Sequence, residues 1–285
     1  MTRLTLEDIG RIAGVSRATV SRVVNGYPHV RPDVRERVEK VIADTGYRPN
    51  AAARSLASHR TNMIGLIVPI VAQRMFDDPY FPVLIQGVAN AAGQHTQISS
   101  LFLINELNEA RKLADDVVHT GFVDGLILAL GDYNWDSLLR DDHIPFVTIG
   151  RSAKAETVPY VEADNEGGGR IATQHLIDLG HRRIGIIAAS DHPTGQGRLD
   201  GYLRALAENR IAFDERLCAQ SDFSFESAVR ATEQLIPQKP SAIFVSSDLM
   251  AVACIQVLNA HGLSVPEDVA VIGFDDLSLA ATTSP

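Results

Sequence analysis

Residues 16 to 25 concentrate side chains that can hydrogen-bond to nucleic acid. If this stretch is helical, its valines fall on one side and its polar and small side chains on the other. A guanidinium group matches the O6/N7 edge of guanine in the major groove and also binds phosphate. The polar side could therefore read DNA bases, although an ordinary solvent-facing helix would carry similar residues. Its members are Arg17, Ala18, Ser21, Arg22 and Asn25.

A second group of polar and aromatic side chains follows apolar, strand-like runs much later in the chain. Carboxylates accept hydrogens from hydroxyl groups, guanidinium groups donate hydrogens to hydroxyl oxygens, and aromatic rings can cover an apolar C–H face. Ligands of parallel sheets bind beyond the carboxyl ends of the strands, so these positions predict a small-molecule site. The positions are Tyr80, Phe81, Arg151, Asp164, Thr194 to Arg198, Asp248, Asp275 and Asp276.

The first group requires two short helices joined by a tight turn. Thr5 is a capping residue followed by two acidic residues, which suits the start of a helix, and Gly14 ends that helix. Ser16 can cap a second helix almost at once, so the spacing predicts a helix-turn-helix. We expect the apolar faces of the two helices to contain Leu6, Ile9, Ile12 and Ala13, and Val20, Val23 and Val24.

The charge of the chain is divided unevenly along its length. Residues 1 to 61 contain 11 Lys and Arg against 6 Asp and Glu, a net charge of +5. The remaining residues contain 15 against 29, a net charge of -14. A basic head on an acidic body is the asymmetry expected when only the head meets phosphate, although many domains carry a basic patch for no such reason.

The segment from Ala13 to Asn25, AGVSRATVSRVVN, closely resembles the recognition motif of the lactose/galactose repressor (LacI/GalR) family. The resemblance continues through a third helix, expected from Pro32 to Asp44, and through Gly46 to Asn50 into the rest of the chain. It implies that Arg17 and Ala18 read bases. It also implies contacts to bases or backbone from Thr5, Ser16, Thr19, Ser21, Arg22 and Asn25, of which Thr19 and Ser21 could equally be plain phosphate anchors.

Residues 49 to 61 form the expected hinge between a headpiece, residues 1 to 48, and a sensor, residues 62 to 285. The run Ala51 to Ala57 has strong helix propensity but is too short to be stable alone, so it should form when something packs on it. Leu56 could simply fasten this segment to the sensor. The resemblance instead implies paired hinge helices in the minor groove, where Leu56 wedges a base step open beside Asn50, Ala53 and Arg54.

The sensor alternates short apolar runs with longer helical stretches, which predicts a doubly wound α/β architecture with parallel strands. The resemblance adds a two-lobed fold shared with periplasmic sugar-binding proteins. The expected strands are Ile64 to Pro69, Ile98 to Leu103, Gly125 to Leu130, Pro145 to Ile149, Ile184 to Ala189, Ala242 to Ser246 and Val269 to Phe274. The expected helices are Pro82 to Gln94, Glu106 to His119, Glu166 to Leu179, Gly197 to Asn209 and Asp248 to His261.

The resemblance also assigns roles to the residues that follow the strands. Arg198 and Asp275 match polar ligand contacts, Tyr80, Phe81 and Phe223 match aromatic walls, and Asp248 matches a residue at the lip of the site. Arg151 and Thr194 complete the expected ligand-binding set. Simpler alternatives are a helix cap for Asp164, a core position for Phe223 and a solvated Asp276. Many members have an Asp where this chain has Gly150, which leaves that side of the site open.

An enzyme is not expected, because the run from Gly195 to Gly201 has one residue too many for a dinucleotide fingerprint and no phosphate-loop, zinc-helix or nucleophile-elbow motif occurs. We expect no cofactor, no metal and no membrane, a cytoplasmic location, and two reduced thiols at Cys218 and Cys254. The expected partners are a pseudo-palindromic operator, a second copy of the chain and a small effector, a sugar or alternatively a purine. Compared with the family, the chain is expected to lack a C-terminal portion.

Overall fold

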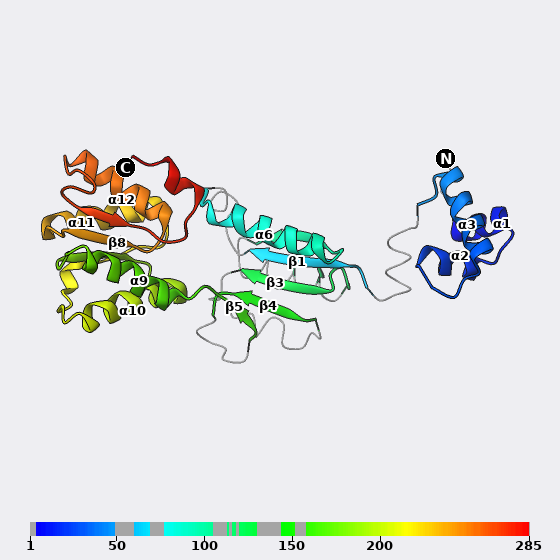
Figure 1. Ribbon diagram of the computed structural model, residues 1–285, viewed down its shortest axis with the longest axis horizontal. Helices are drawn as coiled ribbons and strands as arrows, with labels where there is room; N and C mark the ends of the chain where they lie inside the picture. The colour runs from blue at the N-terminus through cyan, green and yellow to red at the C-terminus, as the bar shows by residue number, and fades with distance from the viewer. Residues whose placement is uncertain are drawn as a thin grey trace. The chain divides into compact units, whose positions relative to one another are not determined.

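The computed structural model describes residues 4–48, 60–68, 77–104, 113, 116–117, 120–129, 144–151 and 158–284. The chain divides into two compact units, Met1–Thr61 and Asn62–Pro285 (Figure 1). The predicted hinge residues Asn50, Ala53, Arg54 and Leu56 lie outside the described residues. The same holds for most of the helix expected from Glu106 to His119.

The first unit contains the predicted helix-turn-helix. Helix α1 spans Leu6–Ala13, α2 spans Arg17–Val24 and α3 spans Pro32–Thr45. The Thr5 hydroxyl accepts a hydrogen bond from the Asp8 amide at 3.3 Å, and the Asp8 carboxylate accepts one from the Thr5 amide at 3.0 Å. This reciprocal cap satisfies two amides that the helix cannot bond internally. Gly14 then ends α1 with a left-handed φ of 65°.

The second helix begins where the capping rule predicts. Ser16 accepts a hydrogen bond from the Thr19 amide at 3.2 Å and thereby caps α2. The two helices approach closely at Gly10, where an added Cβ would lie 2.8 Å from the carbonyl oxygen of Val15. A side chain at Gly10 would therefore force the tight turn open.

The three helices bury one small apolar core, formed by Ile9, Ala13, Val20, Val23, Val38 and Tyr47, with Leu6 and Val24 packed against it. The prediction for Ile12 is wrong, because this residue is 55% exposed. At about 100° per residue, Leu6, Ile9 and Ala13 lie within about 60° of one another around α1, whereas Ile12 lies about 60° beyond Ile9 and therefore outside this stripe. The valines of α2 occupy the core as predicted.

The second unit contains two parallel sheets, as the predicted α/β class requires. The first has the order β2-β1-β3-β4-β5 and the second the order β7-β6-β8-β9. The first sheet comprises β1 (Met63–Val68), β2 (Ile98–Leu103), β3 (Gly125–Ala129), β4 (Phe146–Ile149) and β5 (Tyr160–Val161), with helix α6 (Tyr80–Gln94). The second comprises β6 (Ile184–Ala188), β7 (Cys218–Gln220), β8 (Ala242–Val245) and β9 (Ala270–Ile272).

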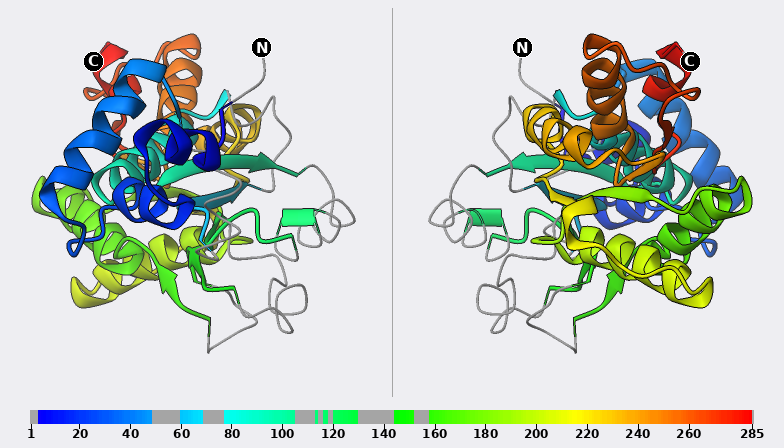
Figure 2. Two further views of the ribbon diagram at one scale, coloured as in Figure 1. Left: turned by 90° about the vertical axis from the view of Figure 1, so that its right-hand side faces the viewer. Right: turned by 90° about the vertical axis from the view of Figure 1, so that its left-hand side faces the viewer.

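Two pairs of helices cover the second sheet, one pair on each face (Figures 1 and 2). Helices α9 (Asn165–Asp178) and α10 (Pro193–Glu208) cover one face, and α11 (Phe225–Leu235) and α12 (Asp248–Ala260) cover the other. Successive residues of a strand point to opposite faces of the sheet. Ile186 packs toward α9 and α10, whereas Ile187 packs toward α11 and α12.

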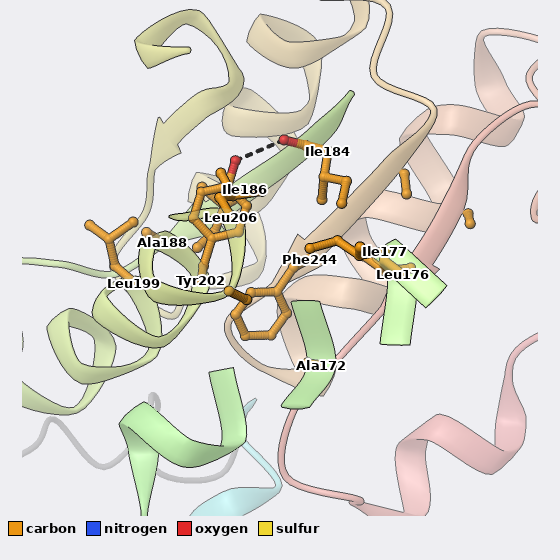
Figure 3. Close-up of a cluster of buried hydrophobic side chains, with 13 residues drawn as sticks. Ala172, Leu176, Ile177, Ile184, Ile186, Ala188, Leu199, Tyr202, Leu206 and Phe244 are labelled. Carbon is orange, nitrogen blue, oxygen red and sulfur yellow. Dashed lines mark hydrogen bonds between the residues drawn. The ribbon is translucent and has the colours of Figure 1, made fainter. Parts of the chain in front are cut away.

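The core under α9 and α10 includes a tyrosine whose hydroxyl is satisfied internally. Tyr202 is 1% exposed, and its hydroxyl donates to the Ile184 carbonyl oxygen at 2.8 Å (Figure 3). Leu176, Leu206 and Phe244 pack in the same cluster. Because a buried hydroxyl without a partner is costly, this bond lets a large aromatic residue fill the space between α10 and the sheet.

The sequence missed strands β5 and β7 and helix α11, and several predicted boundaries differ from the observed ones, most of all the start of α10. Strands β5 and β7 are only two and three residues long, too short to show periodicity, and α11 follows β7 without a Pro or Gly signal. Helix α10 begins at Pro193 rather than at the predicted Gly197. Proline is favoured in the first helical turn, where its missing N–H has no intrahelical role, and this signal marks the earlier start.

Candidate functional site

The predicted DNA-reading face of α2 is exposed to solvent. Arg17, Ala18, Arg22 and Asn25 are exposed, whereas Val20 beneath them is fully buried. Within the described part of the chain, neither Arg17 nor Arg22 forms an ion pair or a side-chain hydrogen bond. Three other arginines of this unit are paired with acidic residues, Arg11 with Asp8, Arg31 with Asp33 and Arg35 with Glu39. The two α2 guanidinium groups therefore remain available to an outside acceptor.

The hydroxyl and amide residues near this face have local partners. The Ser16 and Thr19 hydroxyls lie 2.9 Å apart, and the Asn25 amide donates to the Ser21 hydroxyl at 3.3 Å. The Thr5 hydroxyl donates to the Asp8 carboxylate at 2.7 Å. Each hydroxyl or amide keeps further hydrogen-bonding capacity in this arrangement. These residues therefore organise the helix ends while leaving atoms that can contact a phosphate.

In the second unit, Arg198 is the centre of the predicted effector site. It lies on α10, is 6% exposed and donates hydrogen bonds in three directions. Its Nε donates to the Asn165 side-chain oxygen at 3.1 Å, its Nη1 donates to the Ser246 carbonyl oxygen, and its Nη2 lies 3.1 Å from Asp275 Oδ1. A buried guanidinium needs such partners, and here helix α9 and the segments that follow β8 and β9 supply one each.

Asp275, the second predicted polar contact, follows β9 and has an unusual backbone. Its φ is 103°, in the region that favours glycine, and its side chain is 15% exposed. Burial raises the pKa of the Asp275 carboxyl to about 6, Arg198 opposes the shift, and Asp248 and Asp78 add to it. Burial likewise lowers the pKa of Arg198, with Asp275 opposing. A strained backbone and a perturbed carboxyl at a strand end are typical of a functional site.

Asp248, which the resemblance places at the lip of the effector site, is buried at the start of α12. It is 6% exposed, opens α12 and accepts a hydrogen bond from the Leu277 amide at 2.7 Å. Its own amide donates to the Phe274 carbonyl oxygen at 2.9 Å. Burial raises the pKa of the Asp248 carboxyl, and the Leu277 amide opposes that shift. Asp248 therefore fixes the segment on both sides of Asp275.

The aromatic residues of the predicted site lie in different surroundings. The Phe223 ring is half-buried, its centroid 5.8 Å from Arg198 Cζ and 5.7 Å from the His192 ring. Tyr80 is 36% exposed, and its pKa is raised by burial and by the charge of Asp275. Phe81 is 4% exposed and packs in the core beside β1, 5.4 Å from the Tyr80 ring. The structure thus brings Tyr80 and Phe223 toward Arg198 and places Phe81 behind Tyr80.

Arg151 is directed to another partner. It is exposed, its Nη2 lies 3.1 Å from Glu162 Oε1 and its guanidinium lies over the Tyr160 ring at 5.1 Å. These contacts tie the end of β4 to the segment after β5. Thr194 is half-buried in the first turn of α10, one helical turn before Arg198. Asp164 caps α9 through a 2.8 Å bond from the Gly167 amide, as the simpler alternative predicted.

Sequence reasoning overlooked two residues that contact Arg198. Asn165 bonds its Nε, and Phe274 lies against its guanidinium at 3.7 Å from Cζ to the ring centroid. Both stand directly beside residues that had been noticed, Asp164 and Asp275. A polar amide at the first position of a helix after a strand is the only sequence signal that could have identified Asn165.

An open cavity of about 530 Å³ lies beside this cluster. Of the predicted ligand-binding residues it includes Asp248 and Asp275, but not Arg198, Tyr80 or Phe223. Phe274, which contacts the Arg198 guanidinium, and Gly168 of α9 also line this cavity. Among the described residues, no group of His, Cys, Asp and Glu could hold a metal ion, and no helix is long and apolar enough to cross a membrane.

Each of the two units is similar to a known protein family. Residues 5–50 match the model of bacterial regulatory proteins of the lacI family, and residues 173–285 match a periplasmic binding protein-like domain. The chain is 40% identical to the HTH-type transcriptional regulator CelR of Thermobifida fusca, over 99% of this chain and 85% of that protein.

Two solved structures extend the similarity to the fold. A transcriptional regulator CelR–cellobiose complex matches with a TM-score of 0.74 and 38% identity, covering 98% of this chain and 85% of that one. A lac repressor dimer bound to operator and the anti-inducer ONPF matches with a TM-score of 0.83 and 28% identity, covering 97% and 84%. These proteins are regulators rather than enzymes, and this chain is a DNA-binding transcriptional regulator that belongs to the lacI family of bacterial regulatory proteins.

Proposed function

We propose that this regulator is a repressor whose affinity for its operator is controlled by a neutral sugar bound at Arg198 and Asp275. The observation that carries the proposal is the buried ion pair between these two residues, 3.1 Å from Nη2 to Oδ1, at the carboxyl ends of parallel strands. Residues 1–48 would bind DNA, residues 49–61 would form the hinge and residues 62–285 would sense the effector.

The chemistry of the pair suits a sugar. Three of the five N–H groups of Arg198 have partners, which leaves two, and the second oxygen of Asp275 can accept further hydrogens. Adjacent hydroxyls can accept from the guanidinium and donate to the carboxylate, each bond assisted by charge. Tyr80 and Phe223 supply rings for the C–H face of the sugar. A solved CelR structure contains cellobiose, which supports a neutral glycoside as the effector of the present chain.

On the DNA side, we propose that two copies of the chain bind a pseudo-palindromic operator. One headpiece reads only a half-site, so a two-fold dimer fits a two-fold site. Arg17 and Ala18 would read bases, while Thr5, Ser16, Thr19, Ser21, Arg22 and Asn25 would contact bases or backbone. Leu56 would wedge a central base step, with Asn50, Ala53 and Arg54 alongside it in the minor groove. A lac repressor dimer on operator supports this arrangement. Because it acts on chromosomal DNA, we place the protein in the cytoplasm.

The experiment is a fluorescence anisotropy titration of the purified protein on labelled DNA from upstream of its own gene. Titrating cellobiose, other neutral sugars and purines into the complex should change the affinity with a sugar only. Arg198→Ala should bind the DNA as the wild type does, but adding a sugar should no longer change its DNA affinity. Arg17→Ala should lose affinity for the DNA while still binding the sugar. A response to a purine and to no sugar, or a sugar response that survives Arg198→Ala, would overturn the assignment.

A further inference from the structure

The guanidinium of Arg198 rests on an aromatic ring. Its Cζ lies 3.7 Å from the centroid of the Phe274 ring, closer than the 5.8 Å to Phe223. A cation over a ring face at this distance, in a position that is 6% exposed, is attracted by the negative face of the ring. Phe274 directly precedes Asp275, so one short segment supplies both the ring beneath Arg198 and its carboxylate partner.

The ring of Phe274 is itself in contact with helix α9 at Gly168. A Cβ added at Gly168 of α9 would lie 2.5 Å from Cε2 and 2.7 Å from Cζ of Phe274. The ring edge therefore lies against the bare backbone of α9. At the next residue, a Cβ on Gly169 would lie 2.3 Å from the carbonyl oxygen of Arg198. The first turn of α9 thus contacts both the ring and the backbone that carries the guanidinium.

The hydrogen bonds and the ring constrain different motions of Arg198. Asn165, the Ser246 carbonyl and Asp275 lie around the edge of the guanidinium and fix its position within its own plane. Those acceptors would tolerate some tilting, because hydrogen bonds accept a broad range of angles. The Phe274 ring, 3.7 Å from Arg198 Cζ, prevents the guanidinium from tilting toward the ring. The guanidinium is therefore held in one orientation before any effector arrives.

We propose that Phe274, backed by Gly168, is a positioning residue for effector recognition: its ring holds the Arg198 guanidinium in the plane in which Arg198 and Asp275 together meet two adjacent hydroxyls. This inference rests on the proposed effector site and deepens it. Phe274 need not touch the effector. The ring of Phe274 orders the N–H donors of Arg198 before the effector binds. Ordering these donors during binding would otherwise reduce the affinity.

The first test compares Phe274→Leu with Phe274→Tyr in the full chain, with cellobiose as the probe in calorimetry. Leucine keeps an apolar side chain but removes the ring, so cellobiose should bind about 30-fold more weakly, the size of a desolvated cation–π contact. Tyrosine keeps the ring face and should bind within about twofold of wild type. The proposal is contradicted if both variants lose the same affinity, or if both bind cellobiose as the wild type does. In either case the aromatic ring would make no difference to binding that leucine does not also make.

A second readout needs no effector. The ring should displace the Arg198 side-chain N–H resonances in the NMR spectrum of the free protein and slow the rotation of its guanidinium. Both signatures should vanish in Phe274→Leu and persist in Phe274→Tyr. A wild-type Arg198 whose guanidinium rotates freely and whose resonances do not respond to Phe274→Leu would overturn the proposal whatever sugar the protein binds.

Gly168→Ala tests the support behind the ring without removing a group that contacts Arg198. It should displace Phe274 and weaken cellobiose binding in the same direction as Phe274→Leu. Gly87→Ala is the matched control, since an added Cβ in that helix meets nothing within 4 Å. If Arg198→Ala leaves cellobiose binding intact, the proposed effector site is wrong. If Arg198→Ala abolishes binding while Phe274→Leu and Gly168→Ala do not change it, only the role of Phe274 is wrong.

Discussion

The raised pKa of Asp275 predicts a pH-dependent effector affinity. Burial brings the pKa of this carboxyl to about 6, while Arg198 opposes the shift and Asp248 and Asp78 reinforce it. The proposed sugar needs the ionised carboxylate, because a protonated carboxyl loses acceptor capacity. The apparent dissociation constant equals the intrinsic one divided by the ionised fraction. At pH 5 about one molecule in eleven is ionised, so binding should weaken about 11-fold relative to high pH, whereas at pH 7 the loss is only about 10%.

The stability of the effector-free sensor should change in the opposite direction. A carboxyl with a raised pKa in the folded state binds its proton more tightly than in the unfolded chain. Its stabilising contribution is therefore complete below the usual value of 3.8 and is lost as the pH rises through about 6. The shift corresponds to at most about 3 kcal/mol of unfolding free energy. Affinity should thus rise with pH over the interval in which this contribution to stability falls.

Calorimetric titration of cellobiose between pH 5 and pH 8 tests this, together with thermal melts of the free protein. Asp275→Asn should bind weakly and show a flat profile. His192→Gln is the control for a neighbouring side chain, because the His192 ring lies 5.7 Å from the Phe223 ring, which itself lies 5.8 Å from Arg198 Cζ. A wild-type dissociation constant that stays unchanged from pH 5 to pH 7, or a pH profile that disappears in His192→Gln, would refute the reasoning.

Three further predictions concern the DNA-binding side. Ser16→Ala should reduce headpiece stability by about 1 kcal/mol, since it removes the cap that bonds the Thr19 amide at 3.2 Å; an unchanged melt of the headpiece transition would contradict this. Arg17→Ala should cost about 1–3 kcal/mol on the preferred operator and relax base preference, whereas Arg22→Ala should weaken all sequences and lower the salt dependence; a footprint on one unrepeated half-site would exclude the dimer. Leu56→Ala should reduce operator affinity and DNA bending in circular-permutation gel shifts without lowering the sensor melting temperature, and undiminished bending would exclude the wedge.

The headpiece was predictable because its determinants are local. Thr5 and Ser16 cap helices within three residues of themselves, and Gly14 ends α1 in the left-handed backbone region, which glycine adopts more readily than other residues do. The exposure of Ile12 was not predictable in this way, because it depends on which part of α1 the other helices cover. Periodicity gives the direction of a side chain but not the width of the surface packed against it.

In the sensor, the strands were predictable where they form sustained runs of mostly apolar residues, including β2, in which no residue is buried. The apolar runs at β6 and β8 coincide with strands in which every residue is buried, whereas β5 has two exposed residues and gave no signal. The expectation for Arg151 shows the limit for the site. Its position after β4 was read correctly, but its side chain pairs with Glu162, eleven residues further along the chain, and the sequence contains no rule for that choice.

The same limit applies to Arg198 and Asp275, and the structure adds a constraint on the effector. Both were singled out as ligand contacts, yet they also bind each other, so the site is already neutralised locally before an effector arrives. Asp248 and Asp78 both raise the pKa of Asp275, which means that further negative charge surrounds the one guanidinium. An anionic ligand such as a phosphorylated sugar would have to displace Asp275 from Arg198 and then remain beside three carboxylates, at an electrostatic cost in a partly desolvated site. A neutral diol can instead bond to both members of the pair without separating the charges, and for this reason the geometry favours an uncharged sugar over its phosphate.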